Sequence, residues 1–184
     1  MHGPTPLCKD GVCGALTLES ASTEERLQRF LRRDCDMISG DRAELAALRA
    51  TRTPEPNRWR MLDDTLSREP LGPYVRANDE RWFGIVRWVI HATLVAELHG
   101  LNATTLERVG ANSGAEQRLL AGLIEGAGAG LGLDDAWARN VITQVGNYAE
   151  IFADSVGAGS PLGLERGANA LWRDGGLFFP PPLR

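Results

Sequence analysis

The alternation of apolar and polar side chains divides the amino-terminal part of the chain into short strand-like and helix-like segments. Residues 15–19 (ALTLE) alternate with a period of two, which is typical of a half-buried strand. Hydroxyl side chains that suit a helix cap come next, and residues 24–33 follow them. In that segment Leu27, Phe30 and Leu31 fall on one helical face. The pattern predicts a strand followed by an amphipathic helix.

A second strand-like run, residues 35–39 (CDMIS), comes after this helix. Gly40 and Asp41 then turn the chain into a segment with helical periodicity over residues 42–51. These segments together predict a β-α-β-α unit, the building block of a parallel sheet covered by helices. The prolines of residues 51–59 break the periodicity, which predicts a loop or a connection.

The middle of the chain is dominated by one long apolar segment. Proline and glycine in residues 67–73 favour an extended conformation, which Tyr74 and Val75 continue as a short predicted strand. Residues 80–99 then predict a helix that is apolar on most of its circumference and is stopped by Gly100. We expect this helix to be buried between layers, because it is apolar on most sides. Arg87, His91 and Glu97 interrupt its apolar segment, which argues against a membrane-spanning helix.

The remaining part of the chain predicts further helices and an extended arm. Residues 101–132 contain one or two short helices, and Asp134 is a suitable cap for a longer helix that extends through residue 152. Residues 164–172 predict another helix, and residues 174–184 an arm whose apolar side chains pack back against the body. The long helix has one continuous apolar stripe of Trp137, Val141, Val145, Tyr148 and Phe152, and the arm carries Leu177, Phe178 and Phe179.

The composition describes an ordinary globular polypeptide. Its 184 residues are 43% hydrophobic and 24% charged, enough for one sizeable core or two small ones. The formal net charge of -4 argues against nucleic acid as a partner, because phosphate binding needs clustered positive charge. Arginines gather within residues 49–60, but acidic neighbours neutralise them, which favours a solvated surface over an anion-binding patch. These arginines are Arg49, Arg52, Arg58 and Arg60.

The cysteines do not form a known metal or redox motif. Cys8, Cys13 and Cys35 are an odd number, so at least one stays free or pairs between molecules, and their disulfide state is left open. A zinc site would need a fourth ligand, for which His2 is the only histidine near them in sequence. No base stands near Cys35 to activate it as a nucleophile. We therefore predict neither a metal nor a cofactor.

No other motif points to catalysis. His91 and His99 are predicted to be surface or satisfied core residues, and no Ser-His-Asp order, paired-carboxylate motif or phosphate loop stands out. The glycine-rich residues 126–132 lack the preceding strand and the following acidic residue of a dinucleotide-binding loop. The chain is predicted not to be an enzyme.

Several blocks of the sequence resemble a known family. QVGNYAEIF (144–152), GSPLGLERGANALW (159–172) and DGGLFFPPPLR (174–184) follow one another in the last third, and SREPLGPYVRANDERWFGIVRW (67–88) precedes them. Together they resemble the carboxy-terminal part of the periplasmic general amino-acid-binding proteins of ABC transporters. That family consists of type 2 periplasmic binding proteins, which have two α/β lobes around a ligand cleft.

The resemblance implies an incomplete type 2 periplasmic-binding-protein fold, because such receptors are much longer than this chain. We expect an α/β structure in which remnants of a parallel-type sheet are covered by helices, with a helix-rich carboxy-terminal part. Residues 1–66 would be a remnant of the second, ligand-closing lobe. Residues 67–184 would be the carboxy-terminal part of the first lobe with a helical extension.

A further, weaker block implies a ligand site. RDCDMISGD (33–41) resembles the part of the second lobe where a strand ends in an acidic residue at the cleft. On that resemblance Asp41 matches the aspartate that receives the α-amino group, with Ser39 and Gly40 beside it. A zwitterion also needs an arginine and N–H donors for its carboxylate, and residues 1–23 offer no counterpart. The alternative for Asp41 is a plain helix N-cap.

The function implied is that of a shortened solute-binding component of an amino-acid ABC transporter, which binds L-amino acids and delivers them to a permease. One alternative is a degenerate or repurposed interaction module, whose exposed apolar surface would favour a homo-oligomer or a partner chain. A less favoured alternative is an enzyme on the same scaffold. The resemblance implies the periplasm, although the amino-terminal residues lack the basic start and apolar run of a signal peptide.

Overall fold

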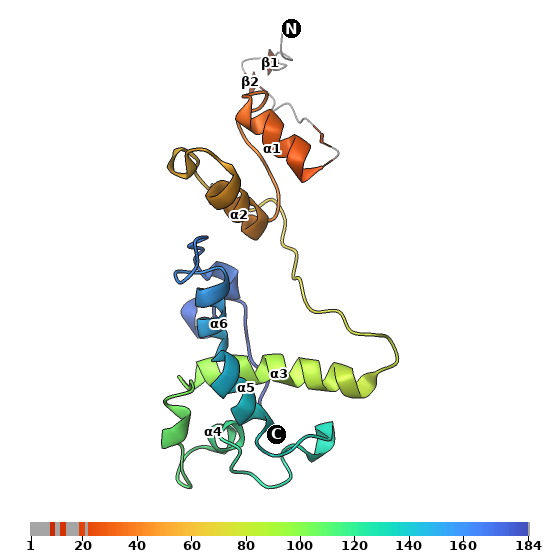
Figure 1. Ribbon diagram of the computed structural model, residues 1–184, viewed down its shortest axis with the longest axis vertical. Coiled ribbons are helices and arrows are strands. Elements are labelled where there is room, and N and C mark those ends of the chain that lie inside the picture. The colour runs from red at the N-terminus through yellow and green to blue at the C-terminus, as the bar shows by residue number, and fades with distance from the viewer. Residues whose placement is uncertain (1–7, 10–11, 14–18, 21, 184) are drawn as a thin grey trace. The chain divides into compact units, whose positions relative to one another are not determined.

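The computed structural model describes the backbone at residues 8–9 and 12–13, and describes residues 19–20 and 22–183 with their side chains. The chain divides into two compact units, Met1–Asp63 and Asp64–Arg184. Helices are the main elements of both units, as Figure 1 shows.

The first unit contains two α-helices where the sequence predicts them. α1 covers Thr23–Leu31 and α2 covers Arg42–Arg52. Ser22 caps α1 and Asp41 caps α2, because each side chain accepts hydrogen bonds from N–H groups of the first turn. The short elements of this unit are the antiparallel pair β1 (Cys8–Lys9) and β2 (Val12–Cys13) and a 3₁₀ turn over Pro56–Arg58.

A polar network and a small core join α1 to α2. Glu44 Oε2 accepts a hydrogen bond from Arg26 Nη2 at 2.7 Å, and its Oε1 accepts one from Thr23 Oγ1 at 2.7 Å. Leu27 and Phe30 are buried beside this network. The apolar face that the sequence predicts for the first helix is thus the face that packs.

The predicted parallel sheet is absent from the described residues. Residues 35–39 and 74–75 are irregular, so both strand predictions are wrong, and most of the strand predicted at 15–19 lies outside the described residues. A strand is stable only beside a hydrogen-bonded neighbour, and neither stretch makes a backbone hydrogen bond to another described segment. The β-α-β-α prediction is therefore wrong at its second strand.

The second unit is built around α3, Glu80–Leu98, the long helix that the sequence predicts. Asp79 caps it, since its carboxylate accepts a hydrogen bond from Trp82 N at 3.0 Å. The expected burial holds only for the carboxy-terminal half. Residues 92–96 are all buried, whereas Trp82 and Phe83 remain 51% and 45% exposed. None of the described helices has both the length and the apolar character of a membrane span.

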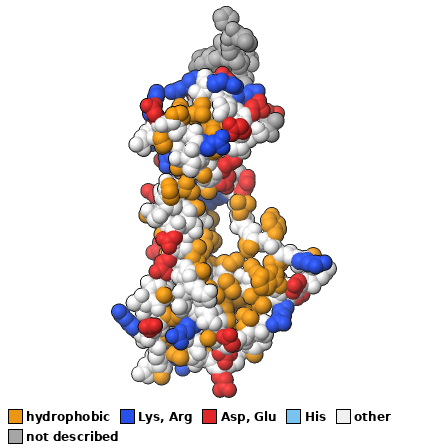
Figure 2. All heavy atoms as spheres, in the orientation of Figure 1, with side chains coloured by type: hydrophobic (Ala, Val, Ile, Leu, Met, Phe, Trp, Pro, Cys, Tyr) orange, Lys and Arg blue, Asp and Glu red, His pale blue; other side chains and the backbone are white. Residues whose placement is uncertain are grey.

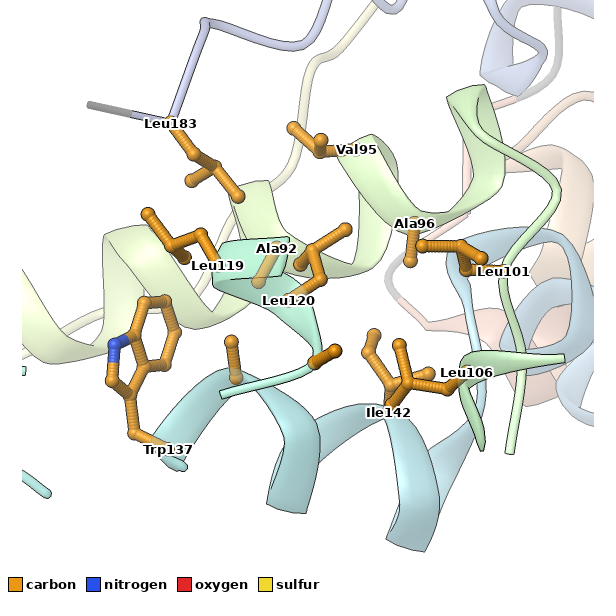
Figure 3. Close-up of a cluster of buried hydrophobic side chains, with 12 residues drawn as sticks. Ala92, Val95, Ala96, Leu101, Leu106, Leu119, Leu120, Trp137, Ile142 and Leu183 are labelled. Carbon is orange, nitrogen blue, oxygen red and sulfur yellow. The ribbon is translucent and has the colours of Figure 1, made fainter. Parts of the chain in front are cut away.

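The core of this unit lies between α3, α4 (Ala115–Leu120) and α5 (Trp137–Val145). Figure 3 shows their apolar side chains directed toward one another, with Leu183 of the carboxy-terminal arm close to Leu119 of α4. Each fully buried large aliphatic side chain contributes about 1.5–3 kcal/mol. The predicted return of the arm to the body holds at Leu183, which is 6% exposed. It is wrong for two of the side chains predicted to make it, because Leu177 and Phe179 are 64% and 70% exposed. The short 3₁₀ turns of this unit are Leu106–Arg108, Ala129–Leu131, Gly167–Asn169 and Trp172–Asp174.

The long helix predicted over residues 134–152 is in fact two helices, α5 and α6 (Tyr148–Ser155). Gly146 between them has a φ of +78°, which glycine adopts without strain. Asn147 then caps α6 and donates from Nδ2 to Leu101 O at 2.9 Å. The prediction of one continuous stripe is wrong, because apolar spacing alone does not show a turn between two helices that bury the same core.

The helix predicted over residues 164–172 is also wrong. Gly167 weakens helix formation there, and the segment forms short turns instead. Leu171 makes a parallel bridge with Phe178, whose ring packs edge-on against Tyr148 with 5.1 Å between the ring centroids. The segment is therefore folded back on itself and onto α6.

An ion pair fixes the carboxy-terminal segment to the end of α3. Arg166 Nη2 lies 3.0 Å from both carboxylate oxygens of Glu97, and the two side chains are only 23% and 11% exposed. The Arg166 guanidinium carbon also lies 5.3 Å from the ring centroids of Tyr148 and Phe152. Arg173 donates to carbonyl oxygens at the end of the same helix. Several later segments thus meet at one helix end.

Replacing Arg166 with alanine should destabilise the second unit, because the nearly buried Glu97 carboxylate loses its partner. We expect the free energy of unfolding to fall by about 1–3 kcal/mol, measured by urea denaturation with tryptophan fluorescence. Arg139→Ala, at an exposed position of α5, is the control and should change it by less than about 0.5 kcal/mol. Equal effects of the two variants would contradict the role assigned to the ion pair.

Candidate functional site

The ligand residues predicted from the sequence lie together at the amino-terminal end of α2. Ser39, Gly40 and Asp41 are all exposed. Asp41 Oδ1 accepts hydrogen bonds from Ala43 N at 2.8 Å and from Glu44 N at 3.1 Å. Its other oxygen, Oδ2, accepts none from the described residues. The cap therefore holds one carboxylate oxygen in place and leaves the second available to a ligand.

Gly40 stands where a side chain has little room. A Cβ atom at this position would lie 3.0 Å from Glu44 Oε2 and 3.4 Å from Arg26 Nη2. The ion pair that joins α1 to α2 thus lies directly beside the predicted site. A larger residue at position 40 would push against that pair and disturb the turn that presents Asp41.

The first unit offers an acceptor for an ammonium group, and the arginine beside Gly40 is already engaged. Arg26, the arginine next to Gly40, already donates to Glu44 at 2.7 Å and to Thr23 at 3.3 Å. A zwitterion at Asp41 would therefore need carboxylate donors other than Arg26. A single exposed carboxylate holds an ammonium only weakly in water, so tight binding needs a second wall that excludes solvent.

The glycine-rich residues 126–132 form a loop whose amide groups are already used. Gly128 N donates to Asp135 Oδ1 and Gly126 N donates to Asp135 Oδ2, both at 3.0 Å. These hydrogen bonds lower the pKa of Asp135, that from Gly128 most strongly. A backbone nest of this kind suits an anion, and here an internal carboxylate fills it. Those donors are not free for a phosphate.

Replacing Asp135 with asparagine should lower stability at neutral pH, because the loop amides lose their charged acceptor. The folded-state pKa of Asp135 is lowered, so its contribution is present above the usual aspartate pKa of about 4 and is lost as the pH falls through the folded value. The difference in melting temperature between parent and Asp135→Asn should therefore be largest near pH 7 and shrink on acidification toward about pH 3. A difference that stays constant over this range would contradict the assignment.

The contacts of the arginines in residues 49–60 do not indicate an anion-binding site, because two of them are paired with glutamates. Arg52 lies 2.6 Å from Glu24 Oε2, and Arg58 lies 2.6 Å from Glu55 Oε2. Both pairs are exposed and contribute little to stability. The positive charges of Arg52 and Arg58 are thus neutralised by acidic neighbours, as the sequence indicates.

The cysteines and histidines give no metal site in the described part of the chain. Cys35 is a free, half-buried thiol, and the side chains of Cys8 and Cys13, like His2, lie outside the described residues. Backbone pairing of β1 and β2 sets Cys8 opposite Cys13. Among the described residues, no group of three histidine, cysteine, aspartate or glutamate side chains could hold a metal ion.

His91 lies within α3 and His99 directly follows it, and each has contacts within the second unit. His99 Nε2 lies 2.9 Å from Glu116 Oε2, and Glu116 Oε1 accepts a hydrogen bond from Leu183 N at 3.0 Å. Burial, together with the charge of Arg87, lowers the pKa of His91. Sequence reasoning missed Glu116 as the partner of His99, because it lies on a different helix.

Sequence reasoning also missed a polar network made by the motif at residues 144–152. Glu150 Oε2 accepts from Asn147 N at 2.9 Å, and its Oε1 accepts from Asn102 Nδ2 at 3.2 Å. The Asn-x-x-Glu spacing of a capping box was the signal that could have revealed it. An open groove of about 710 Å³ adjoins this network, but Asn102 and Glu150 in its lining are engaged in structural hydrogen bonds.

Comparison with known proteins shows which proteins the chain resembles. The chain is 44% identical over 151 residues to YhdW of Escherichia coli K12, named as an amino-acid ABC transporter-binding protein, and the match spans 82% of this chain and 44% of YhdW. It is 41% identical over 165 residues to the glutamate/glutamine/aspartate/asparagine-binding protein BztA of Rhodobacter capsulatus, spanning 89% and 48%. It is 40% identical over 152 residues to the general L-amino acid-binding periplasmic protein AapJ of Rhizobium johnstonii, spanning 82% and 44%.

The chain is homologous to the amino-acid ABC transporter-binding proteins. It spans about half the length of the curated relatives it matches. These relatives are named for transport and binding, which agrees with the prediction that the chain is not an enzyme. No protein-family model matches the chain.

A solved structure supports the same relationship. A periplasmic binding protein of an ABC transporter from Brucella ovis, with glutathione bound, matches this chain with a TM-score of 0.73 and 37% sequence identity. The match covers 79% of this chain and 46% of that one. The predicted periplasmic-binding-protein fold is confirmed at this level, whereas its parallel-sheet remnants are not found among the described residues.

Proposed function

We propose that this chain is a solute-binding component of an amino-acid ABC transporter and that its Asp41 site receives the α-ammonium group of the ligand. The observation that carries the proposal is the 40–44% identity to proteins named for amino-acid binding. The names of the relatives and the ligand of the solved neighbour also share one chemistry. Free amino acids and the γ-glutamyl end of glutathione all present an α-ammonium beside an α-carboxylate.

The geometry at the end of α2 fits the ammonium half of that chemistry. An ammonium has three N–H donors and no acceptor, so it needs carboxylate or carbonyl oxygens. Asp41 offers one oxygen fixed by the helix cap and one that no described residue uses. Ser39, two residues before Asp41, is exposed and carries a hydroxyl, and Gly40 between them has no side chain.

Tight binding would come from closure of a second wall over this site. A ligand that contacts both walls drives hinge closure, and the removal of water strengthens its charged hydrogen bonds. The second wall would supply the donors for the ligand carboxylate. In this account residues 1–66 belong to the ligand-closing lobe and residues 67–184 to the other lobe.

The cellular location and the partner that we propose for this chain are taken from the names of the relatives. AapJ and the Brucella ovis neighbour are both named as periplasmic, so we place the chain in the periplasm, where it would deliver L-amino acids to an ABC permease. A non-binding interaction module is the second candidate. It is favoured by one observation, the large exposed side chains of residues 66–83.

Thermal unfolding against a panel of L-glutamate, L-glutamine, L-aspartate and L-asparagine tests the proposal. A ligand that binds only the folded state raises the melting temperature by mass action, and we expect a rise of several degrees for the parent chain. Asp41→Asn should abolish the rise, because asparagine still caps α2 but carries no charge for the ammonium.

Ser22→Ala is the matched control, since it removes the cap of α1 and leaves the Asp41 site intact. It should lower the melting temperature without ligand and keep the ligand-induced rise. A rise that survives in Asp41→Asn would contradict the role of Asp41. The absence of any rise in the parent chain would contradict the proposed function.

A further inference from the structure

The short strands β1 and β2 place two cysteines opposite one another. Their antiparallel pairing sets Cys8 against Cys13 and Lys9 against Val12. Residues directly opposite in an antiparallel pair have Cα atoms about 4.5–5.5 Å apart. A disulfide needs a Cα separation of about 4.4–6.8 Å, so this register meets the backbone requirement for one.

The sequence between the two strands favours the same register. Asp10 and Gly11 separate Lys9 from Val12, and Asp-Gly is a preferred dipeptide of two-residue hairpin loops. A loop of that length pairs the residues on either side of it, which brings Cys8 and Cys13 opposite one another at the next position. Loop chemistry and backbone pairing thus agree on which residues face each other.

The third cysteine has no such counterpart in the described residues. Cys35 is a free, half-buried thiol in an irregular segment. The backbone pairings described, β1 with β2 and Leu171 with Phe178, do not include it. Figure 2 shows charged side chains on the first unit, and those that flank Cys35 in sequence are Asp34 and Asp36. Cys35 is therefore the cysteine that we expect to stay unpaired.

We propose that Cys8 and Cys13 form an intramolecular disulfide that closes the amino-terminal hairpin and leaves Cys35 as a free thiol. Disulfides form and persist in oxidising compartments, and the periplasm proposed above is one of them. The bond would fasten two strands that are marginally stable by themselves, because it removes conformations from the unfolded chain. It is independent of the Asp41 site and of amino-acid binding.

A small disulfide oxidant supplies the two-electron oxidation. The thiolate of either cysteine attacks the oxidant, which forms a mixed disulfide and releases one thiolate. The thiolate of the other cysteine then attacks the cysteine sulfur of that mixed disulfide, closes the Cys8–Cys13 bond and releases the second thiolate. Two protein thiols are oxidised, one disulfide is reduced to two thiols, and the two protons of the protein thiols pass to them.

Peptide mass analysis of the full chain, reduced and then treated with hydroxyethyl disulfide followed by iodoacetamide, tests the proposal. Trypsin cuts after lysine and arginine, so it places the three cysteines in separate peptides, residues 1–9, 10–26 and 34–42. We expect peptides 1–9 and 10–26 to stay joined until a reductant is added, and peptide 34–42 to carry alkylated Cys35. The intact mass should be that of one chain, which excludes a bond between two molecules.

Cys35→Ser is the matched control and should keep the joined peptides, whereas Cys13→Ser should lose them. Oxidation in concentrated guanidinium chloride should lower the yield of joined peptides several-fold, because the unfolded chain no longer holds the two cysteines opposite one another. Alkylation of both Cys8 and Cys13 in the oxidised parent, a bond from Cys35 to either of them, or an equal yield in denaturant would overturn the proposal. Asp41→Asn should give the parent yield, which separates failure here from failure of the proposed function.

Discussion

The pairing of Glu97 with Arg166 is the contact on which the packing of the second unit depends. The Glu97 side chain is 11% exposed, and a carboxylate at that depth is strongly unfavourable without a partner. Arg166 meets this need and at the same time brings the carboxy-terminal segment onto the end of α3. Asn147 acts similarly at the next turn, where it donates to Leu101 O. Asn147 and Arg166 both lie in the last-third motifs that resemble the receptor family.

The sequence predicts best the elements that depend on local chemistry. α1, α2 and α3 begin at side-chain caps of the residue types that favour a helix start, and the structure identifies them as Ser22, Asp41 and Asp79. The predictions over residues 35–39 and 74–75 fail for a different reason, since a strand needs a neighbour that local pattern does not supply. The break at Gly146 was missed because both helices bury side chains in the same core, which preserves apolar spacing across the turn.

The candidate ligand site could be predicted only in part. The resemblance of residues 33–41 to the receptor family pointed to Asp41, and the structure adds that the cap uses Oδ1 and leaves Oδ2 without a described partner. The position of the Arg26–Glu44 pair beside Gly40 could not be foreseen, because it joins residues 18 apart on two helices. In the proposed function, this site would bind the ammonium end of an amino acid, and a second surface would bind the other end.

The central claim is that Asp41 recognises the α-ammonium group, and calorimetric titration with two ligands tests it most directly. L-Glutamate carries that group, whereas glutarate has the same two carboxylates and no ammonium. Titrated into the full chain under identical conditions, L-glutamate should bind and glutarate should not. Equal binding of the two ligands, or no binding of L-glutamate, would contradict the account.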